Sequence, residues 1–268
     1  MRRSILFLLS VILICTQACR AEYIRATDEE EIILIPAESE IRMGKSISKD
    51  VEKRFGLYKD TFLQERIDDI GQKLAAVSDR RDITYHFKVL EGEELKKEHR
   101  INAFALPGGY VYIFKDMVEF MESDDEIAGI LAHEIGHIAA KHSVKKLQGS
   151  LGAMALNLLG VAMTSDNKTK GRMNAAIGLL MTSYSRKDEE MADKLSVRYV
   201  KKAGYDPKAI LKTMDKMIKM QREMPIRVYS AYQSHPYYSE RKAALKKEVY
   251  GRVDFVDFIN APVTPGKR

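Results

Sequence analysis

The chain has 268 residues, of which 45% are hydrophobic and 31% charged, and its formal net charge is +6 at pH 7. This length and composition suit one large globular domain, and neither an internal repeat nor a linker rich in Gly, Ser or Pro divides it. The positive excess is too small to indicate nucleic-acid binding. The only cysteines are Cys15 and Cys19, which excludes a disulfide framework.

The first residues predict export. Arg2 and Arg3 precede the apolar run Ile5–Ile14, which is too short to span a bilayer. We therefore interpret residues 1–18 as a signal peptide. Its removal lowers the net charge from +6 to +4, because Arg2 and Arg3 are lost with it.

Cys19 would then begin the mature chain and is a candidate for lipidation, which would anchor the protein to the outer membrane on its periplasmic side. The lipobox is imperfect, since Thr16 stands where Leu is usual, and ordinary cleavage after Ala18 is the alternative. Residues 19–35 are polar and predict a tether.

The stretch Ser123–His142 predicts a helix that carries the chemistry of the chain. Ser123 followed by Glu126 is a capping box, and the two aspartates between them suit the positive end of a helix dipole. The residues expected to form the core face recur at helical spacing: Ile127, Leu131, Ile135 and Ile138.

Within this helix lies the sequence H-E-I-G-H. His133 and His137 are four residues apart, so one helix face presents two imidazoles to the same metal ion. Glu134 is placed to act as general base on a water held by that ion. The alternative is a buried helix that happens to contain two histidines.

A catalytic zinc takes three protein ligands, so a third must come from elsewhere. The candidate segment is Ser185–Asp193, in which Glu189 and Asp193 are four apart and share one face. Asp188 and Glu190 are the next candidates, and a solvated helix start is the alternative interpretation of the whole segment.

Together these motifs resemble zinc endopeptidases of the HtpX, CAAX prenyl protease and BepA type, which are gluzincins. H-E-x-x-H is followed some fifty residues later by S-R-x-x-E-x-x-A-D. The segments 101–112 (N-A-F-x-x-P-G-G) and 203–207 also fit the family, as does His235-Pro236 with Arg241. The likeness runs from about Pro36 to Leu245. It departs from the family at Met191, where Glu or Gln is usual.

The resemblance implies one Zn²⁺ per chain. Its ligands would be His133, His137 and Glu189, with Glu134 as the base and Asp193 orienting a histidine ligand. By the same resemblance His235 and Arg241 would stabilise the oxyanion.

His235 has two open roles. It is either an oxyanion donor or a removable plug in the place of the water. Arg241 favours the donor, because it would bring positive charge to the same oxygen.

Residues 102–114 predict two short strands joined at Pro107-Gly108-Gly109. A substrate would add as a further strand at this edge, which makes Asn102, Ala103 and Phe104 candidates for substrate binding. A plain core hairpin is the alternative.

Helical spacing elsewhere predicts helices over 41–55, 62–77 and 241–250, a helix from Glu189 to Gly204, and another that begins at Asp206-Pro207. We expect the helix over 62–77 to turn Phe62, Ile67, Ile70 and Leu74 to the core.

Residues 83–89 predict a strand with Ile83, Tyr85, Phe87 and Val89 inward and His86 in water. His99 is expected to be solvated and His142 to be structural. The apolar runs 151–163 and 175–181 are too short to span a membrane, and the alternatives for them are close-packed helices, a flap over the cleft or contact with a membrane surface.

The sequence therefore predicts an α+β, predominantly helical domain over residues 36–250, of gluzincin type with a small edge-exposed sheet, followed by a tail at 251–268. The family resemblance implies zinc-dependent proteolysis of misfolded or unassembled proteins in the bacterial cell envelope. The alternative is a zinc-bearing assembly factor or chaperone for outer-membrane proteins, against which an intact Glu134 argues.

Overall fold

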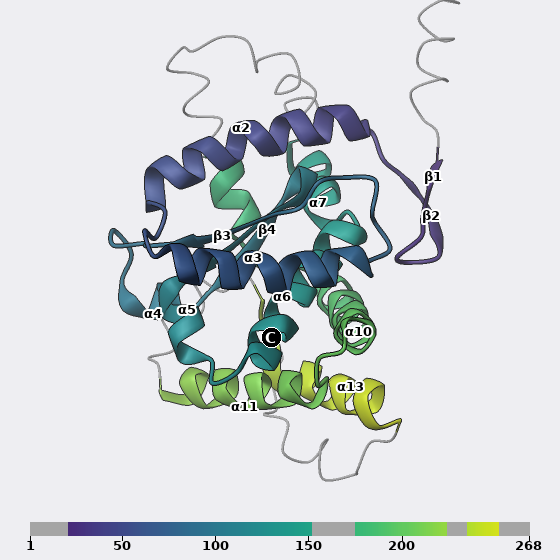
Figure 1. Cartoon of the computed structure of the whole chain (residues 1–268). Coiled ribbons are helices and arrows are strands. Elements are labelled where there is room, and N and C mark those ends of the chain that lie inside the picture. Colours follow the sequence, from purple (N-terminus) through teal and green to yellow (C-terminus); the bar gives the residue numbers. More distant parts are fainter. Residues whose placement is uncertain (1–20, 152–174, 224–234, 252–268) are drawn as a thin grey trace, which may run out of the picture.

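The computed structural model describes residues 21–151, 175–223 and 235–251 (Figure 1). Its helices are α2 (Ala37–Phe55), α3 (Thr61–Ala76), α4 (Lys97–Arg100), α5 (Lys115–Phe120), α6 (Asp124–Ala139), α7 (His142–Leu151), α10 (Arg186–Ala203), α11 (Lys208–Glu223) and α13 (Tyr238–Tyr250). Its strands are β1 (Ala21–Ile24), β2 (Glu29–Ile32), β3 (His86–Leu90), β4 (Ala103–Leu106) and β5 (Tyr110–Phe114). The predicted signal peptide, Cys19, most of the apolar run 151–163 and nearly all of the tail lie outside the described residues.

A three-stranded sheet in the order β3-β5-β4 forms the β part of the fold. β3 is parallel to β5 and β4 is antiparallel to it, with Ala103 opposite Ile113. A 3-10 turn, η1 (Pro107–Gly109), joins β4 to β5, and both of its glycines have positive φ. The hairpin predicted over residues 102–114 is thus confirmed.

The outer edge of β3 is covered by side chains from α3. The amide of Gln64 donates to the carbonyl of Val89 at 2.9 Å and accepts from its N–H at 3.2 Å, and Gln72 donates to the carbonyl of Tyr85. These amides replace the hydrogen bonds that another strand would make, so this edge is blocked to strand addition. The opposite edge, β4, packs toward α6.

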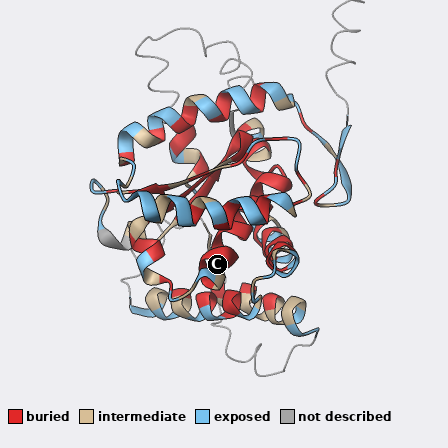
Figure 2. Cartoon of the chain, viewed as in Figure 1, coloured by how far each residue is buried: buried red, intermediate tan, exposed pale blue. Residues whose placement is uncertain are grey.

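The helices lie on both sides of the sheet. α2 covers one face, α3 and α6 lie on the other, and α11 and α13 lie at the far end of the molecule from α2 (Figure 1). α6 contacts α3, α10 and α11 and is buried at every position from Glu126 to Ala139, so it forms the centre of the core (Figure 2). The predicted α+β, mostly helical architecture is confirmed.

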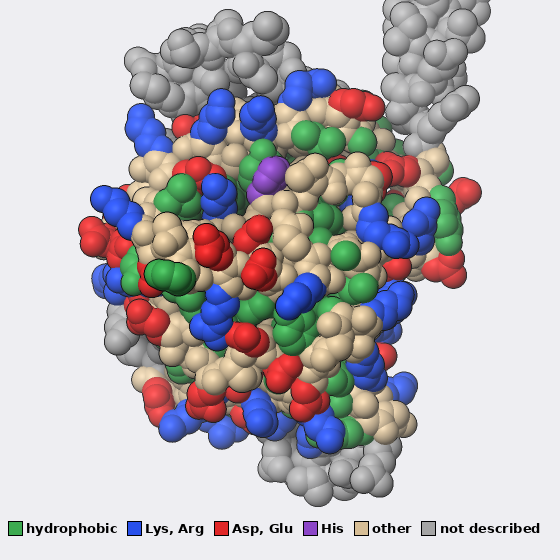
Figure 3. All heavy atoms as spheres, in the orientation of Figure 1, with side chains coloured by type: hydrophobic (Ala, Val, Ile, Leu, Met, Phe, Trp, Pro, Cys, Tyr) green, Lys and Arg blue, Asp and Glu red, His purple; other side chains and the backbone are tan. Residues whose placement is uncertain are grey.

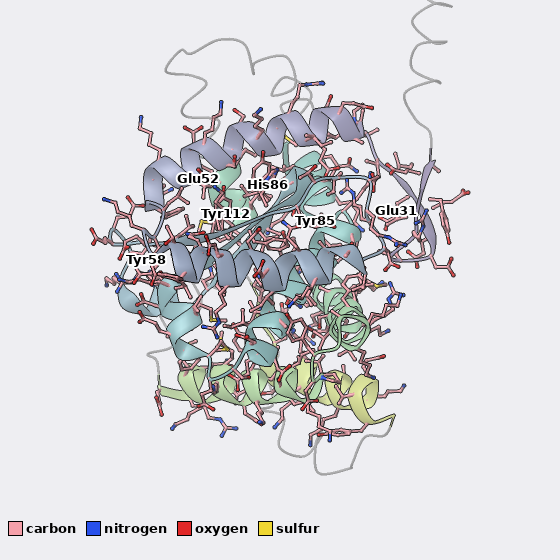
Figure 4. The ribbon with its side chains drawn as sticks, viewed as in Figure 1. Glu31, Glu52, Tyr58, Tyr85, His86 and Tyr112 are labelled. Atoms are coloured by element: carbon pink, nitrogen blue, oxygen red, sulfur yellow. The ribbon has the colours of Figure 1, made fainter. Side chains whose placement is uncertain are left out.

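Three expectations about single residues were wrong. Phe62 is 83% exposed, because it lies about 140° around α3 from the stripe formed by Ile67 and Leu74. His86 is half-buried and stacks on Tyr110 at 4.5 Å, on the sheet between α2 and α3 (Figure 4). His99 is also half-buried.

The segment expected to be a tether is partly structured. β1 and β2 form an antiparallel hairpin, and Ile24 and Ile35 are buried in the core. Lys141 donates to Glu22 at 2.6 Å, and Lys145 donates to Glu31, which lies on the side of the hairpin that faces the body of the molecule (Figure 4). The apolar residues therefore insert this segment into the core, and the acidic residues attach it to Lys141 and to α7.

Acidic and basic side chains are interspersed over the face shown in Figure 3, without one large patch of a single sign. Within the described residues, no helix combines the length and the apolar character needed to cross a bilayer.

Candidate metal centre

The N-terminal cap of α6 and the turn that follows its last residue differ from the sequence prediction. The Ser123 hydroxyl accepts from the N–H of Glu126 as predicted, but the Glu126 carboxylate accepts from Glu122 rather than from Ser123, so the capping box is only half formed. The helix ends at Ala139 instead of continuing to His142. Lys141 adopts a positive φ of 55° there, and the chain turns back into α7.

The two α6 histidines face one carboxylate from α10. The Nε2 atoms of His133 and His137 are 3.1 Å apart, and the Glu189 carboxylate oxygens lie 3.4 Å from the first and 3.5 Å from the second. Ligands that sit 2.0–2.1 Å from a tetrahedral zinc lie about 3.3 Å from one another. All three residues are buried. These residues therefore fit a zinc ion.

α10 packs closely on α6 because the contact is made by two small residues, Gly136 of α6 and Ala192 of α10. A side-chain carbon added at Gly136 would lie 3.0 Å from the carbonyl of Ala192. Ser185 and Asp188 form a complete capping box at the start of α10, which turns Glu189 inward in the first turn. The two alternative candidates for the third metal ligand are placed differently from Glu189. Asp188 belongs to the capping box of α10, and Glu190 is exposed.

Asp193 and Arg241 support the ligands from behind. The Nδ1 of His133 lies 3.0 Å from a carboxylate oxygen of Asp193, which leaves Nε2 for the metal. Arg241 donates to Asp193 through Nε and Nη2 at 2.8 and 2.7 Å, and its Nη1 lies 2.6 Å from Glu189. The guanidinium of Arg241 is thus engaged by both carboxylates.

Glu189 is ionised despite its burial. Burial alone would raise its pKa, but Arg241 and His235 hold the pKa of this carboxyl well below its usual range. Burial lowers the pKa of His137 to about 4, so its imidazole is neutral at neutral pH. A carboxylate and a neutral imidazole are the forms that bind a metal. Burial alone would lower the pKa of His133, but its hydrogen bonds to Asp193 and Glu189 outweigh burial and raise it, so a metal would compete with a proton there.

His142 supports the second histidine, a role that helical spacing did not predict. The Nδ1 of His142 lies 2.9 Å from the Nδ1 of His137, and its Nε2 lies 3.4 Å from Asp188. Burial holds the pKa of His142 well below its usual value, so the neutral ring is available as an acceptor. On a continuous helix His142 would point away, and the break after Ala139 brings it back.

Tyr184 was also missed by sequence reasoning. Its ring stacks on His137 with centroids 4.1 Å apart and an interplanar angle of 22°, and its hydroxyl lies 3.2 Å from that of Ser143. No spacing rule connects this residue to the zinc helix, and its only signal is its place immediately before the Ser185 cap.

Glu134 and His235 contact each other beside the three candidate ligands. The Nε2 of His235 lies 3.2 Å from the buried Glu134 carboxylate. Its Nδ1 lies 3.2 Å from the Nε2 of His133 and 3.0 Å from Glu189, so it stands at the fourth corner of the ligand group. Burial alone would lower the pKa of His235, but the two carboxylates raise it to about 10.

The predicted substrate-binding residues divide into two groups. Asn102 and Ala103 line a cavity that also contacts Glu134. Phe104 does not, because alternation along β4 turns its ring to the other face, where it stacks on Tyr112 at 5.4 Å and contacts Phe114.

Comparison with known proteins gives consistent matches. Residues 62–249 match the pattern described as Peptidase family M48. The chain is 23% identical over 192 residues to the Beta-barrel assembly-enhancing protease of Escherichia coli K12, which covers 68% of this chain and 38% of that relative. It is 26% identical over 201 residues to the Mitochondrial metalloendopeptidase OMA1 of Schizosaccharomyces pombe, covering 73% and 57%. It is 28% identical over 154 residues to the Metalloprotease YcaL of Escherichia coli K12, covering 56% and 58%. The chain thus spans less than two thirds of the length of each of these relatives.

Proposed function

The chain belongs to peptidase family M48, and from this premise we propose that it is a zinc-dependent endopeptidase of the bacterial cell envelope. The observation that carries the proposal is the ligand group. The Nε2 atoms of His133 and His137 lie 3.1 Å from each other and 3.4–3.5 Å from the two carboxylate oxygens of Glu189, and Glu134, the residue after His133, is buried.

In this mechanism the protein orients a peptide carbonyl and a water beside Glu134. A bound zinc ion supplies Lewis acidity to that site. Glu134 takes the proton of the water and passes it to the leaving nitrogen. Arg241 and Asp193 hold Glu189 and His133 in position, since each is paired to a ligand.

We place the substrate backbone along β4. Of the two outer strands of the sheet, β3 is blocked by Gln64 and Gln72, whereas Ala103 of β4 lines the cavity beside Glu134. A peptide added at this edge gains main-chain hydrogen bonds and passes the zinc ligands in extended form. Extended, unfolded chains are the form that such an edge accepts.

The proposed substrates are unfolded or unassembled envelope proteins. Residues 1–18 would direct export to the periplasm, and lipidation of Cys19 would anchor the protein to the outer membrane. One relative is named for enhancing β-barrel assembly, which supports a role near outer-membrane proteins. The mild net charge and mixed surface argue against a nucleic-acid partner.

Replacement of the base tests the proposal. Glu134→Gln keeps the side-chain shape and cannot accept a proton, so zinc content should remain at one ion per chain. Cleavage of a chemically unfolded protein should fall by about 10²–10⁴-fold. Glu190→Gln, an exposed position on α10, is the matched control and should cleave as the native chain does. Retention of more than about a tenth of the activity in Glu134→Gln would contradict the role of Glu134 as base.

The same variant separates the protease from an assembly factor. The place of His235 at the fourth corner of the ligand group is the observation that favours the assembly factor, since it closes the site to water. If the protein assists assembly by binding alone, Glu134→Gln should support the assembly of outer-membrane proteins as well as the native chain does.

A further inference from the structure

A second cavity lies at the N-terminal hairpin, away from the proposed zinc ligands. Its wall is formed by β1 and the turn after it, by the loop between α3 and β3, and by the end of α6; the hairpin itself projects from the side of the molecule (Figure 1). The volume of the cavity is about 450 Å³, which is within the range of sites that bind small molecules. No residue of the wall belongs to the proposed metal centre, so a ligand bound here would be separate from the substrate.

Basic side chains give this wall its chemical character. Those that line the cavity are Arg25, Arg80, Arg81 and Lys141. Arg25 and Arg81 are exposed, and among the residues that the structure describes neither has a hydrogen-bond or ion-pair partner. A guanidinium donates through a planar fork that matches the oxygens of a phosphate group. Two unpaired arginines in one wall therefore favour an anionic ligand.

Arg80 adds a buried donor to the same wall. Its side chain is 5% exposed and donates to both carboxylate oxygens of Glu40, at 2.8 and 2.7 Å, and to the carbonyl of Ile138 at 3.2 Å. The remaining Nε is buried without a hydrogen bond, and the carboxylate of Asp82 lies 3.9 Å from it. A buried N–H without an acceptor costs free energy, so a ligand oxygen that accepts from Arg80 would be stabilised.

The acidic residues of the wall leave the two exposed arginines available. Glu22 accepts from Lys141 through both of its oxygens, at 2.6 and 2.7 Å. Asp79 is paired with Arg198. Asp82 remains, and its side chain is 66% exposed, so water and salt screen its charge. The unpaired positive charges of the wall thus outnumber the one weakly engaged carboxylate.

We infer that this cavity binds a phosphate group, carried by a phospholipid headgroup or free as a phosphate anion. The inference goes beyond the proposed protease and requires neither zinc nor Glu134. The place of the cavity brings a headgroup within reach. Glu22 follows Cys19 by three residues, which span at most about 11 Å, so a lipidated Cys19 would hold the wall close to the headgroup layer. Tyr23, also in the wall, is 56% exposed, as suits an aromatic side chain at the boundary between membrane and water.

Titration of the purified full-length protein with three probes tests the inference and separates the two sources. The probes are dihexanoyl phosphatidylglycerol, dihexanoylglycerol and inorganic phosphate, and calorimetry measures their affinities. The phosphatidylglycerol should bind at least about 10-fold more tightly than dihexanoylglycerol, which has the same acyl chains and no phosphate. Inorganic phosphate binding as tightly as the phosphatidylglycerol would support a site for free phosphate. Equal binding of both lipids without binding of phosphate, or no binding of any probe, would overturn the inference.

Replacement of the two unpaired arginines tests the location of the site. The combined variant Arg25→Gln/Arg81→Gln should lose at least about 10-fold in affinity for the phosphate-bearing probe. Arg222→Gln is the matched control, because Arg222 is exposed on α11 and is not part of the wall. Thermal unfolding without ligand shows whether each variant is folded. Unchanged affinity in a folded double variant would overturn the inference.

A change of the opposite sign tests the charge of the ligand. Asp82→Asn removes a negative charge near Arg80 and should strengthen binding of the same probe about 2–5-fold. Asp50→Asn, at an exposed position on α2, is the control for net charge and should leave the affinity unchanged. Weaker binding in Asp82→Asn would show that the wall holds a cationic group through its carboxylates, which would overturn the inference. None of these measurements uses cleavage, so their result does not depend on the proposed protease.

Discussion

Glu189 is the residue that we propose as the third ligand beside the pair of histidines. It follows His137 by 52 residues (189 − 137) on another helix, it is fully buried, and Arg241 neutralises its charge. Because its pKa is held well below the usual range, it needs no deprotonation when a metal binds. The cost of burying this carboxylate is offset by the guanidinium, which is itself held by Asp193.

Removal of Glu189 should therefore remove the metal. We expect Glu189→Ala to weaken zinc binding by more than about 100-fold, since even residues that only orient ligands contribute 10–100-fold. Competition with a chelator measures the affinity. Glu190→Ala is the control and should bind zinc normally, because its side chain is exposed. Normal zinc affinity in Glu189→Ala would show that the third ligand is another residue.

The contact between His142 and His137 can be tested through one atom, the Nδ1 of His142. When His137 binds the metal through Nε2, its Nδ1 carries a proton and needs an acceptor, which is the Nδ1 of His142 at 2.9 Å. In His142→Asn the amide oxygen takes the place of Nδ1, whereas in His142→Gln the amide reaches the place of Nε2.

We expect His142→Ala and His142→Gln to lose 10–100-fold in zinc affinity and His142→Asn to retain most of it. Equal loss in the Asn and Gln variants would mean that His142 acts by filling space. Thermal unfolding of the metal-free proteins shows whether the fold is changed.

At the scale of elements, helix spacing predicted the pair of histidines but not what supports them. His133, Glu134 and His137 follow from one periodic helix, which the structure contains. His142 was expected only to be structural. Its contact with His137 was not predicted, because the break at Lys141 requires a positive φ, and no glycine or asparagine at that position indicates one. Local pattern therefore finds ligands on one element and misses contacts made by a turn of the chain.

Long-range pairing was equally hidden from the sequence. Glu189 and Asp193 shared a predicted face, but only the family resemblance indicated that this face meets α6. The close approach depends on Gly136 and Ala192, two small residues on different helices. Phe62 shows the opposite error, since an apolar residue near a helix start was assigned to the core and lies in water.

α2 positions the hairpin that carries the proposed substrate edge. A side-chain carbon at Gly44 would lie 2.0 Å from the carbonyl oxygen of Pro107 in η1, and the N–H of Gly108 donates to Glu40. Gly44→Ala should force α2 away from the sheet and cost about 1–3 kcal/mol of unfolding free energy, measured by denaturant titration.

Gly149→Ala in α7 is the control, because no atom within 4 Å meets its added carbon. It should stabilise the protein by about 0.5–1 kcal/mol through helix propensity. A neutral Gly44→Ala would show that α2 does not hold the hairpin tightly.

At the scale of the whole molecule, the site is closed by a residue that lies far along the chain from the zinc helix. His235 follows α6 by about 100 residues and directly precedes α13, whose Arg241 is bound to Asp193. Arg241 was expected to share the oxyanion with His235. Its donors are instead engaged by Asp193 and Glu189, which removes the reason for preferring the donor role of His235.

The position of His235 now favours the plug. Its Nδ1 lies 3.2 Å from the Nε2 of His133 and 3.0 Å from Glu189, which is the spacing of a fourth zinc ligand and the place where a water must enter. Three ligands remain without it, so His235→Ala should retain zinc and cleave an unfolded protein faster than the native chain. His86→Ala, a half-buried histidine on the sheet, is the control and should cleave at the native rate. If instead His235→Ala loses about 10²-fold or more in turnover with its zinc intact, His235 is a transition-state donor, because a donor contributes only as charge develops on the substrate oxygen.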